Sequence, residues 1–312
     1  MASLITGSFA YDTIMVFSGQ FKNEILPDKV HMLNVAFLVP KLRREFGGCA
    51  GNIAYNLNML GGAALPMGTV GHDFAPYAAW MDKCGVSREF VLEVPEAYTA
   101  QAYITTDLDD NQITAFHPGV MSFSHLQKVP ANPARIQFGS VSPDGREGMI
   151  QHAQQFAEAG IPFLFDPGQG LPMFTGDELK TFIEQASFMA VNDYESEVVM
   201  NKTGLTVEEI AERLKALIVT RGGKGAQIYA GGKLHEIPVA HANSLTDPTG
   251  CGDAFRGGLL YGLENGMDWD TAGRIGSLMG AYNIERPGTQ NHKFSVEAFH
   301  ERFVKEFRYS YR

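Results

Sequence analysis

The chain has 312 residues, a length that suits one large domain or two modest ones and is ample for a sizeable core. Its formal net charge of −10 argues against a nucleic-acid or anionic-membrane partner. Three cysteines without a CxxC pair fit a reducing compartment, and we recognise neither a signal peptide nor an apolar run of about 18 residues. We therefore expect a cytoplasmic protein whose partners are small molecules.

Two segments in the first third of the chain predict a small separate sheet. Residues 30–39 have strand composition, and residues 99–116 alternate polar and apolar side chains around a turn, as a hairpin does. We expect strands from about 13–40 and 98–117 to form a β-sheet lid inserted into a single domain that spans residues 1–312. A lid of this kind excludes water from a group-transfer step.

From residue 135 onward, strands and helices alternate regularly. The expected strands are 136–140, 161–166, 188–191 and 218–220, and the expected helices are 144–159, 176–186, 207–217, 270–284 and 295–307. This alternation predicts an α/β fold, with a central, mostly parallel sheet flanked by helices on both faces. Ligands of such sheets bind beyond the carboxyl ends of the strands, where Asp166, Asn192 and Thr220 lie.

Two glycine-rich segments each precede a helix. In the first, Gly47 to Asn52, the glycines allow close backbone approach, and the Asn52 amide can both donate to and accept from hydroxyl groups. The second is Asp247-Pro248-Thr249-Gly250-Cys251-Gly252-Asp253, followed by an apolar helical pattern. Free N–H groups at such a helix start suit an anion. Either segment can also be a purely structural turn.

Asp253 is the residue that favours chemistry over structure. A carboxylate beside an anion site is electrostatically unfavourable unless it has a task, such as taking a proton from an attacking hydroxyl group. The alternative is an ordinary acidic residue in the first turn of a helix. The backbone N–H groups of Gly250, Cys251 and Gly252 would then hold the transferred phosphate, with Asp253 as the general base.

Other residues fit the remaining needs of phosphoryl transfer. Gly222 and Gly225 can pass close to a nucleotide, and Thr220 can donate to a phosphate. Asn192 and Glu195 are spaced to share one side of a helix start and to hold Mg²⁺ through water, although a helix N-cap with a first-turn acid is the commoner reason for such a pair taken alone. Neither a Walker A motif nor the HRD and DFG motifs of protein kinases occur.

These motifs resemble those of the ribokinase-like (PfkB) carbohydrate and nucleoside kinases over nearly the whole chain. Residues 247–255 are similar to the C-terminal signature of that family, residues 47–52 to its N-terminal signature, and Asn192-x-x-Glu195 to its metal-associated motif. Within the family, the chain looks most like bacterial adenosine kinases of the mycobacterial type. Further matching stretches are Gly7-Ser8, Leu26-Pro27, Phe37-Leu38-Val39 and Asp166-Pro167-x-Gln169.

The resemblance implies an ATP- and Mg²⁺-dependent kinase for the 5′-hydroxyl of a purine nucleoside, most of all adenosine. It implies that Asp253 deprotonates that hydroxyl. It also implies a nucleoside site and a monovalent cation, such as K⁺, near Asp247 and Thr249. The nucleoside-site residues would be Ser8, Asp12, Phe37, Gly48, Asn52, Tyr103, Phe116 and Gln169.

Two departures from the subgroup bear on which base is accepted. Gly170 stands where the subgroup tends to have a second glutamine, and Ala36 where it tends to have serine, so inosine or guanosine are further candidates. A ribose or fructose kinase and a non-catalytic nucleoside sensor are the alternative functions. Aromatic residues near the site favour a base over a bare sugar, and Asp253 argues against a sensor. The exposed edges of the lid suggest a homodimer formed by two lids.

Overall fold

The computed structural model describes residues 1–25, 34–109, 111–130 and 134–312. Leu26 and Pro27, and the first part of the strand expected at 30–39, lie outside these residues. In the part of the chain that the structure describes, no helix is both long and apolar enough to cross a lipid bilayer.

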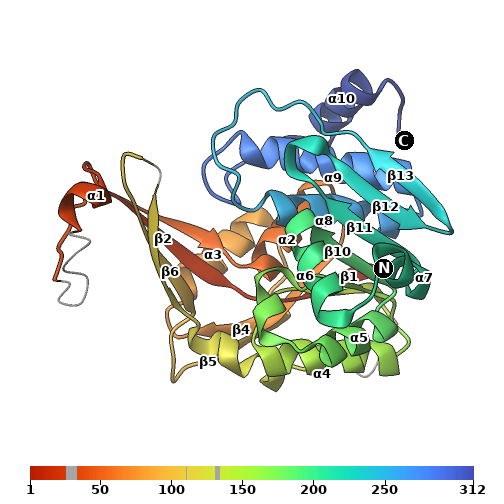
Figure 1. Ribbon diagram of the computed structural model, residues 1–312, viewed down its shortest axis with the longest axis horizontal. Helices are drawn as coiled ribbons and strands as arrows, with labels where there is room; N and C mark the ends of the chain where they lie inside the picture. Colours follow the sequence, from red (N-terminus) through yellow and green to blue (C-terminus); the bar gives the residue numbers. More distant parts are fainter. Residues whose placement is uncertain (26–33, 110, 131–133) are drawn as a thin grey trace.

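A nine-stranded sheet forms the centre of the molecule, in the order β13-β12-β11-β10-β9-β8-β1-β4-β5 (Figure 1). Its strands are β1 (Ala2–Thr6), β4 (Ala64–Gly71), β5 (Phe90–Val94), β8 (Ile136–Val141), β9 (Phe163–Phe165), β10 (Phe188–Asn192), β11 (Ala216–Thr220), β12 (Ala226–Ala230) and β13 (Lys233–Ile237). All pairs from β5 to β11 are parallel, and β12 and β13 add an antiparallel edge. The predicted mostly parallel sheet is confirmed.

Helices cover both faces of this sheet because successive residues of each strand point to opposite sides. In β10, Met189 and Val191 pack with the helices α4 to α7, whereas Phe188 and Ala190 pack with α8 and α9. The helices are α2 (Cys49–Met59), α3 (Ala75–Cys84), α4 (Arg146–Glu158), α5 (Gly176–Gln185), α6 (Asp193–Thr203), α7 (Val207–Arg213), α8 (Cys251–Glu264), α9 (Trp269–Ile284) and α10 (Val296–Phe307).

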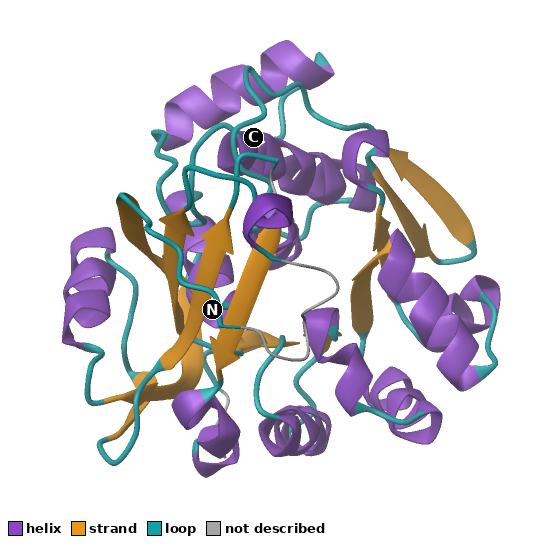
Figure 2. Ribbon diagram, turned by 60° about the vertical axis from the view of Figure 1, so that its left-hand side comes forward, coloured by secondary structure: helices purple, strands orange, loops and turns teal. Residues whose placement is uncertain are grey.

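The expected lid is a second, four-stranded sheet in the order β3-β2-β6-β7, which comes forward in Figure 2. Its strands are β2 (Ala10–Val16), β3 (Lys41–Gly47), β6 (Ala100–Thr106) and β7 (Gln112–His117). A short helix, α1 (Phe21–Glu24), follows β2 at the far end of the lid from α8 (Figure 1).

One lid strand lies later in the chain than the sequence indicated. Residues 34–39 form no strand, and β3 begins at Lys41, directly after Pro40. Proline lacks the N–H that a ladder position needs, so the strand starts behind it. The sequence analysis also missed β5 and the 3-10 helix Gly119–Leu126, and it placed the end of α7 at residue 217, whereas the helix ends at Arg213.

Candidate active site

A cavity of about 990 Å³ lies at the carboxyl ends of the central strands. Asp166 follows β9, Asn192 ends β10 and Thr220 ends β11, and all three line the cavity. The start of α8 forms another wall with Gly250 to Asp253. The convergence expected at this edge of the sheet is therefore present.

The start of α8 depends on two glycines for different reasons. Gly250 has a φ of 79°, and a Cβ there would lie 2.7 Å from Thr289 Cγ2. At Gly252 the reason is space, because a Cβ would lie 2.9 Å from Nη1 of Arg256. With glycine at both positions, the first N–H groups of the helix can face the cavity as an anion site.

The side chain of Asn52 connects Asp253 to the helix α2. Asn52 Nδ2 donates to Asp253 Oδ2 at 2.8 Å, while Asn52 Oδ1 accepts from Thr289 Oγ1 at 2.7 Å and from Gln290 Nε2 at 3.0 Å. Those two donors fix the orientation of the amide, so its N–H₂ group must face Asp253. Thr289 and Gln290 were missed by the sequence analysis, since neither stands in a recognisable motif.

The carboxyl group of Asp253 experiences opposing influences. Burial raises its pKa, and the hydrogen bond from Asn52 and the nearby charge of Arg256 lower it, with a net rise. A carboxylate whose pKa is raised is a better proton acceptor than an ordinary aspartate. The geometry therefore fits the expected general base.

Ser8, Asp12 and Gly48 lie beside the start of α2, the helix that carries Asn52. Ser8 Oγ accepts from Cys49 N at 3.2 Å, and a Cβ at Gly48 would lie 2.5 Å from the Ser8 carbonyl oxygen. A Cβ at Gly47 would lie 2.5 Å from Asp12 Oδ2, so the lid strand β2 and the start of α2 meet at glycine. These residues form one continuous polar region with Asn52 and Asp253.

Asp12 is surrounded by other acidic residues. Burial, Glu45 across the strand pair, Asp253 and Asp247 together raise the pKa of Asp12 to about 6. A carboxylate in this setting gains from hydrogen-bond donors that a ligand brings, because they offset the repulsion. Two adjacent sugar hydroxyl groups are donors of that kind.

The three predicted aromatic residues of the lid lie in different places. Phe116 shares a face with Asp12, since both align with Ala102 across the sheet, and it is 53% exposed. Tyr103 aligns with Thr13 and therefore points to the opposite face. Phe37 packs against Phe17 and Phe21 at centroid distances of 4.9 and 5.0 Å. The structure thus brings only Phe116 to the Asp12 face of the lid sheet.

The other end of the cavity contains the predicted nucleotide-binding glycines. Gly222 and Gly225 both line it, and Gly225, with a φ of 84°, would place a Cβ 2.1 Å from the Ile237 carbonyl oxygen. Gln169 also lines the cavity. The sequence analysis missed an apolar wall formed by Val239, Ala240, Ala242, Leu245, Ala281 and Ile284. These residues lie in a loop and in α9, where no motif distinguishes them.

Asn192 and Glu195 form a reciprocal helix cap. Glu195 N donates to Asn192 Oδ1, and Asn192 N donates to Glu195 Oε2, both at 2.8 Å. The pair therefore caps α6, as the structural alternative expected, and both residues also line the cavity. Across the described residues, no group of three or more His, Cys, Asp or Glu side chains could hold a metal ion.

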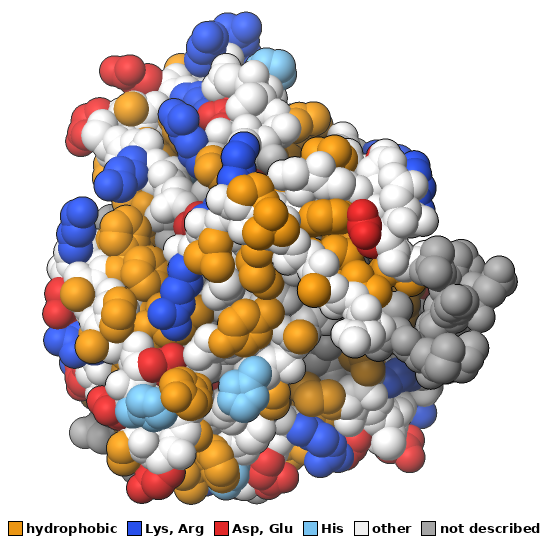
Figure 3. All heavy atoms as spheres, turned by 90° about the vertical axis from the view of Figure 1, so that its left-hand side faces the viewer, with side chains coloured by type: hydrophobic (Ala, Val, Ile, Leu, Met, Phe, Trp, Pro, Cys, Tyr) orange, Lys and Arg blue, Asp and Glu red, His pale blue; other side chains and the backbone are white. Residues whose placement is uncertain are grey.

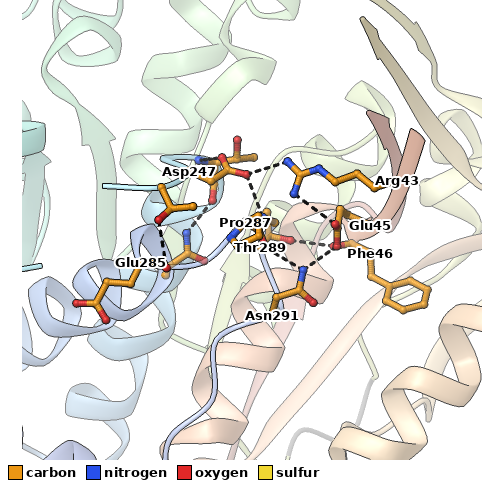
Figure 4. A network of polar contacts seen from close by, with 12 residues as sticks. Arg43, Glu45, Phe46, Asp247, Glu285, Pro287, Thr289 and Asn291 are labelled. Carbon is orange, nitrogen blue, oxygen red and sulfur yellow. Dashed lines mark hydrogen bonds and ion pairs between the residues drawn. The ribbon is translucent and has the colours of Figure 1, made fainter. Parts of the chain in front are cut away.

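Asp247 is tied to the lid and to the chain after α9 (Figure 4). Its carboxylate accepts from Gly288 N at 2.9 Å and Thr249 N at 3.0 Å. Arg43 of β3 lies 3.4 Å from both Asp247 Oδ2 and Glu45 Oε1. The surroundings of Asp247 and Thr249, the residues predicted to lie near a cation, are thus rich in oxygen atoms, but the guanidinium group of Arg43 already supplies positive charge there.

A buried ion pair beneath the cavity was not predicted. Arg256 and Asp166 are 6% and 2% exposed, and Arg256 Nη2 donates to Asp166 Oδ1 at 2.7 Å. The sequence analysis included Asp166 among the strand-end residues but overlooked Arg256, because this arginine interrupts an otherwise apolar helical pattern. The feature of the sequence that could have revealed it is a charged residue three positions after Asp253, on the same side of the helix.

Comparison with known proteins agrees with the resemblance seen in the motifs. The model of the pfkB family carbohydrate kinases matches residues 15–295. The nucleoside kinase of Methanocaldococcus jannaschii is 31% identical over 274 residues, 87% of this chain and 90% of the relative. Its crystal structure, described as an archaeal member of the ribokinase family, has a TM-score of 0.89 and covers 98% of this chain and 99% of its own.

The nucleoside kinase of Burkholderia thailandensis is more similar. Its complex with inosine is 53% identical, with a TM-score of 0.90 and 99% of both chains covered. Its complex with ADP and inosine is 55% identical, with a TM-score of 0.88 and coverage of 99% of this chain and 97% of the other. The chain therefore belongs to the pfkB family of carbohydrate kinases, has the ribokinase-like fold, and is a phosphotransferase that acts on an alcohol group.

Proposed function

We propose that this kinase transfers the γ-phosphoryl group of ATP to the 5′-hydroxyl group of a purine nucleoside. The observation that supports the proposal is the hydrogen bond between Asn52 of α2 and Asp253 at the start of α8, because it joins the candidate base to the helix that begins beside Asp12 and Ser8. The relatives named nucleoside kinase support the nucleoside as the acceptor.

In this mechanism the residues act in sequence. Asp12 accepts hydrogen bonds from the ribose hydroxyl groups, and Asn52 donates to them. Together they hold the 5′-hydroxyl group next to Asp253. Asp253 takes the hydroxyl proton as the 5′-oxygen attacks the γ-phosphorus atom, and the bond from this phosphorus to the oxygen that bridges to the β-phosphate breaks, so that ADP leaves. The N–H groups of Gly250 to Gly252 bind the charge that accumulates on the transferred group, which a fixed helix start does without reorganisation.

The donor nucleotide fits the opposite end of the cavity. Gly222 and Gly225 let the backbone approach its phosphates, and the apolar wall beside α9 suits an adenine ring. Mg²⁺, when bound with the nucleotide, neutralises the phosphate charge. Glu195 is the residue that would orient its water ligands, held in place by the cap with Asn192.

Adenosine is the acceptor we expect first, with inosine and guanosine as further substrates. The B. thailandensis relative was solved with inosine, and glycine stands at residue 170, where the adenosine kinase subgroup tends to have glutamine. A panel of adenosine, inosine, guanosine, ribose and fructose, each with ATP and Mg²⁺ and followed by ADP release, tests the assignment. Turnover of the free sugars alone would favour the sugar-kinase alternative, which relatives named as fructokinases keep open.

Two lids are expected to pair into a homodimer. Leu42 and Ile113 are 64% and 44% exposed and lie in one cross-strand row of the lid sheet, and Tyr103, 42% exposed, lies on the same face. Figure 3 looks onto the lid end of the molecule, where hydrophobic side chains gather. Covering such a face stabilises a dimer. Light scattering tests this, and a monomer at assay concentration would refute it.

A further inference from the structure

The charge of Arg256 lies directly beneath the phosphate-binding turn, and the mechanism above does not use it. The side chain is 6% exposed on α8, three residues after Asp253. Nη2 donates to Asp166 Oδ1 at 2.7 Å and to the Ala190 carbonyl oxygen at 3.3 Å, and Nε contacts Asp166 Oδ2. Asp166, directly after β9, and Ala190, within β10, thus hold the guanidinium group in one position.

The guanidinium group is close to the backbone of the turn as well. A Cβ at Gly252 would lie 2.9 Å from Nη1 of Arg256, so the arginine occupies the space that a side chain at residue 252 would need. The positive charge therefore stands against the same peptide groups that face the transferred phosphate. Its field adds to that of the helix start.

Stability alone is a weak reason for such a pair. Removing two charges from water costs several kcal/mol for each ion, and apolar residues of similar volume often serve a core equally well. Both members also line the cavity, which is unusual for a purely structural pair. A role in the chemistry of the cavity accounts for the pair better.

We propose that Arg256 is a positioning residue for phosphoryl transfer, which keeps the Asp253 carboxylate ionised and strengthens the anion site, while Asp166 holds its guanidinium group in place. The inference rests on the proposed role of Asp253 as the base. Proton uptake from the 5′-hydroxyl requires an ionised carboxylate. A fixed cation one helical turn away favours that form over the neutral acid.

Several other groups act on Asp253, and Arg256 is the cation among them. The Arg256 charge lowers the pKa of Asp253, opposing burial, and the charge of Asp253 in turn raises the pKa of Arg256. The other titratable groups that face Asp253 are Asp12 from β2, Cys49 from α2, Tyr77 from α3, Asp166 after β9, Glu195 from α6 and Cys251 from α8. With Arg256 removed, every remaining charged neighbour is acidic.

The experiment measures kcat between pH 5 and 9, with saturating nucleoside and Mg-ATP, for four variants. Arg256→Met removes the charge, Arg256→Lys keeps it, and Arg256→Met with Asp166→Asn removes both charges without leaving a buried carboxylate unpaired. Arg274→Met is the matched control, because it removes a partly buried arginine of α9 that pairs with Asp270. It changes the net charge equally but lies outside the cavity.

We expect the acid limb of the kcat profile to move upward by about one pH unit or more in Arg256→Met, and upward by less in the double variant, because that variant also removes the acidic Asp166. The lysine variant should stay near the wild type, the control should not move, and nucleoside KM should change less than about threefold. An unmoved acid limb in a folded double variant would overturn the inference. So would an effect confined to the KM for ATP, which would make Arg256 a nucleotide ligand instead.

Failure of this inference is distinguishable from failure of the proposed base. Asp253→Asn should be inactive across the whole pH range if Asp253 is the base. Retained turnover in that variant would remove the base assignment and with it the role of Arg256. An inactive Asp253→Asn together with unshifted Arg256 variants would overturn only the role of Arg256.

Discussion

Replacing Asp12 with asparagine should make the protein more stable at alkaline pH while weakening its acceptor site. Asp12 lies among Glu45, Asp247 and Asp253, and a Cβ at Gly47 would touch its carboxylate, so the side chain is crowded by charge and by backbone. Asparagine keeps the shape of the side chain and removes its charge. The ionised Asp12 of the wild type therefore lowers the free energy of unfolding, and the variant lacks this effect.

The size of this cost follows from the pKa of Asp12. It is about 6 in the folded protein, against about 3.9 in an unfolded chain. Because the folded-state value is raised, the contribution of Asp12 to stability is fully present below pH 4 and is lost as the pH rises through about 6. At pH 8 the loss amounts to about 3 kcal/mol at most.

Urea unfolding without ligands at pH 4.5, 6 and 8 measures the difference. We expect Asp12→Asn to exceed the wild type in free energy of unfolding at pH 8 and to approach it at pH 4.5. Asp177→Asn is the control, because that carboxylate is 98% exposed and its removal should change stability by less than about 0.5 kcal/mol at any pH. A pH-independent offset between Asp12→Asn and the wild type would refute the reasoning.

Three further predictions follow from the same contacts. Asp253→Asn should fold normally and lose at least about 10²-fold in kcat, with nucleoside binding by calorimetry largely kept, and unchanged turnover would contradict the mechanism. Arg43→Met should increase the ratio of the rate in K⁺ to the rate in Na⁺, because the arginine supplies positive charge to Asp247 that a bound cation would otherwise supply. An unchanged ratio would show that Arg43 and the cation do not compete for Asp247. Asp144 is buried with its pKa raised to about 8, so its contribution to stability should be lost as the pH rises from about 4 to about 8, and Asp144→Asn should remove this part of the pH dependence in urea titrations.

The sequence predicted the parts of the site that backbone chemistry determines. Glycines at the start of α8, and polar residues such as Asn192 and Thr220 at strand ends, are recognisable because only certain residues suit a tight helix start or the edge of a parallel sheet. The fold followed from the same alternation of strands and helices. These features are local in the chain, so they can be read without knowing which segments meet.

The parts that were missed depend on contacts between distant segments. Arg256 meets Asp166 across 90 residues, and Thr289 meets Asn52 across 237 residues. The start of β3 shows a different limit. The apolar residues before Pro40 suggested a strand, but the strand that pairs with β2 is the charged segment Lys41–Gly47. Its Arg43 and Glu45 form an ion pair with each other, and Arg43 also pairs with Asp247.

The Asn52 amide connects Asp253 with the segment after α9 and, through that segment, with the lid. Its oxygen is occupied by Thr289 and Gln290, which come from the segment after α9, so its nitrogen is available only to Asp253 or to a ligand between them. That segment also donates to Asp247 through Gly288 N, and Asp247 contacts Arg43 of the lid. A ligand that moves the lid strand β3 therefore acts on the same short segment that orients Asn52, and through it on the base. If Asp253 is the base, these contacts would couple acceptor binding to it through hydrogen bonds and the ion pair of Arg43 rather than by proximity alone.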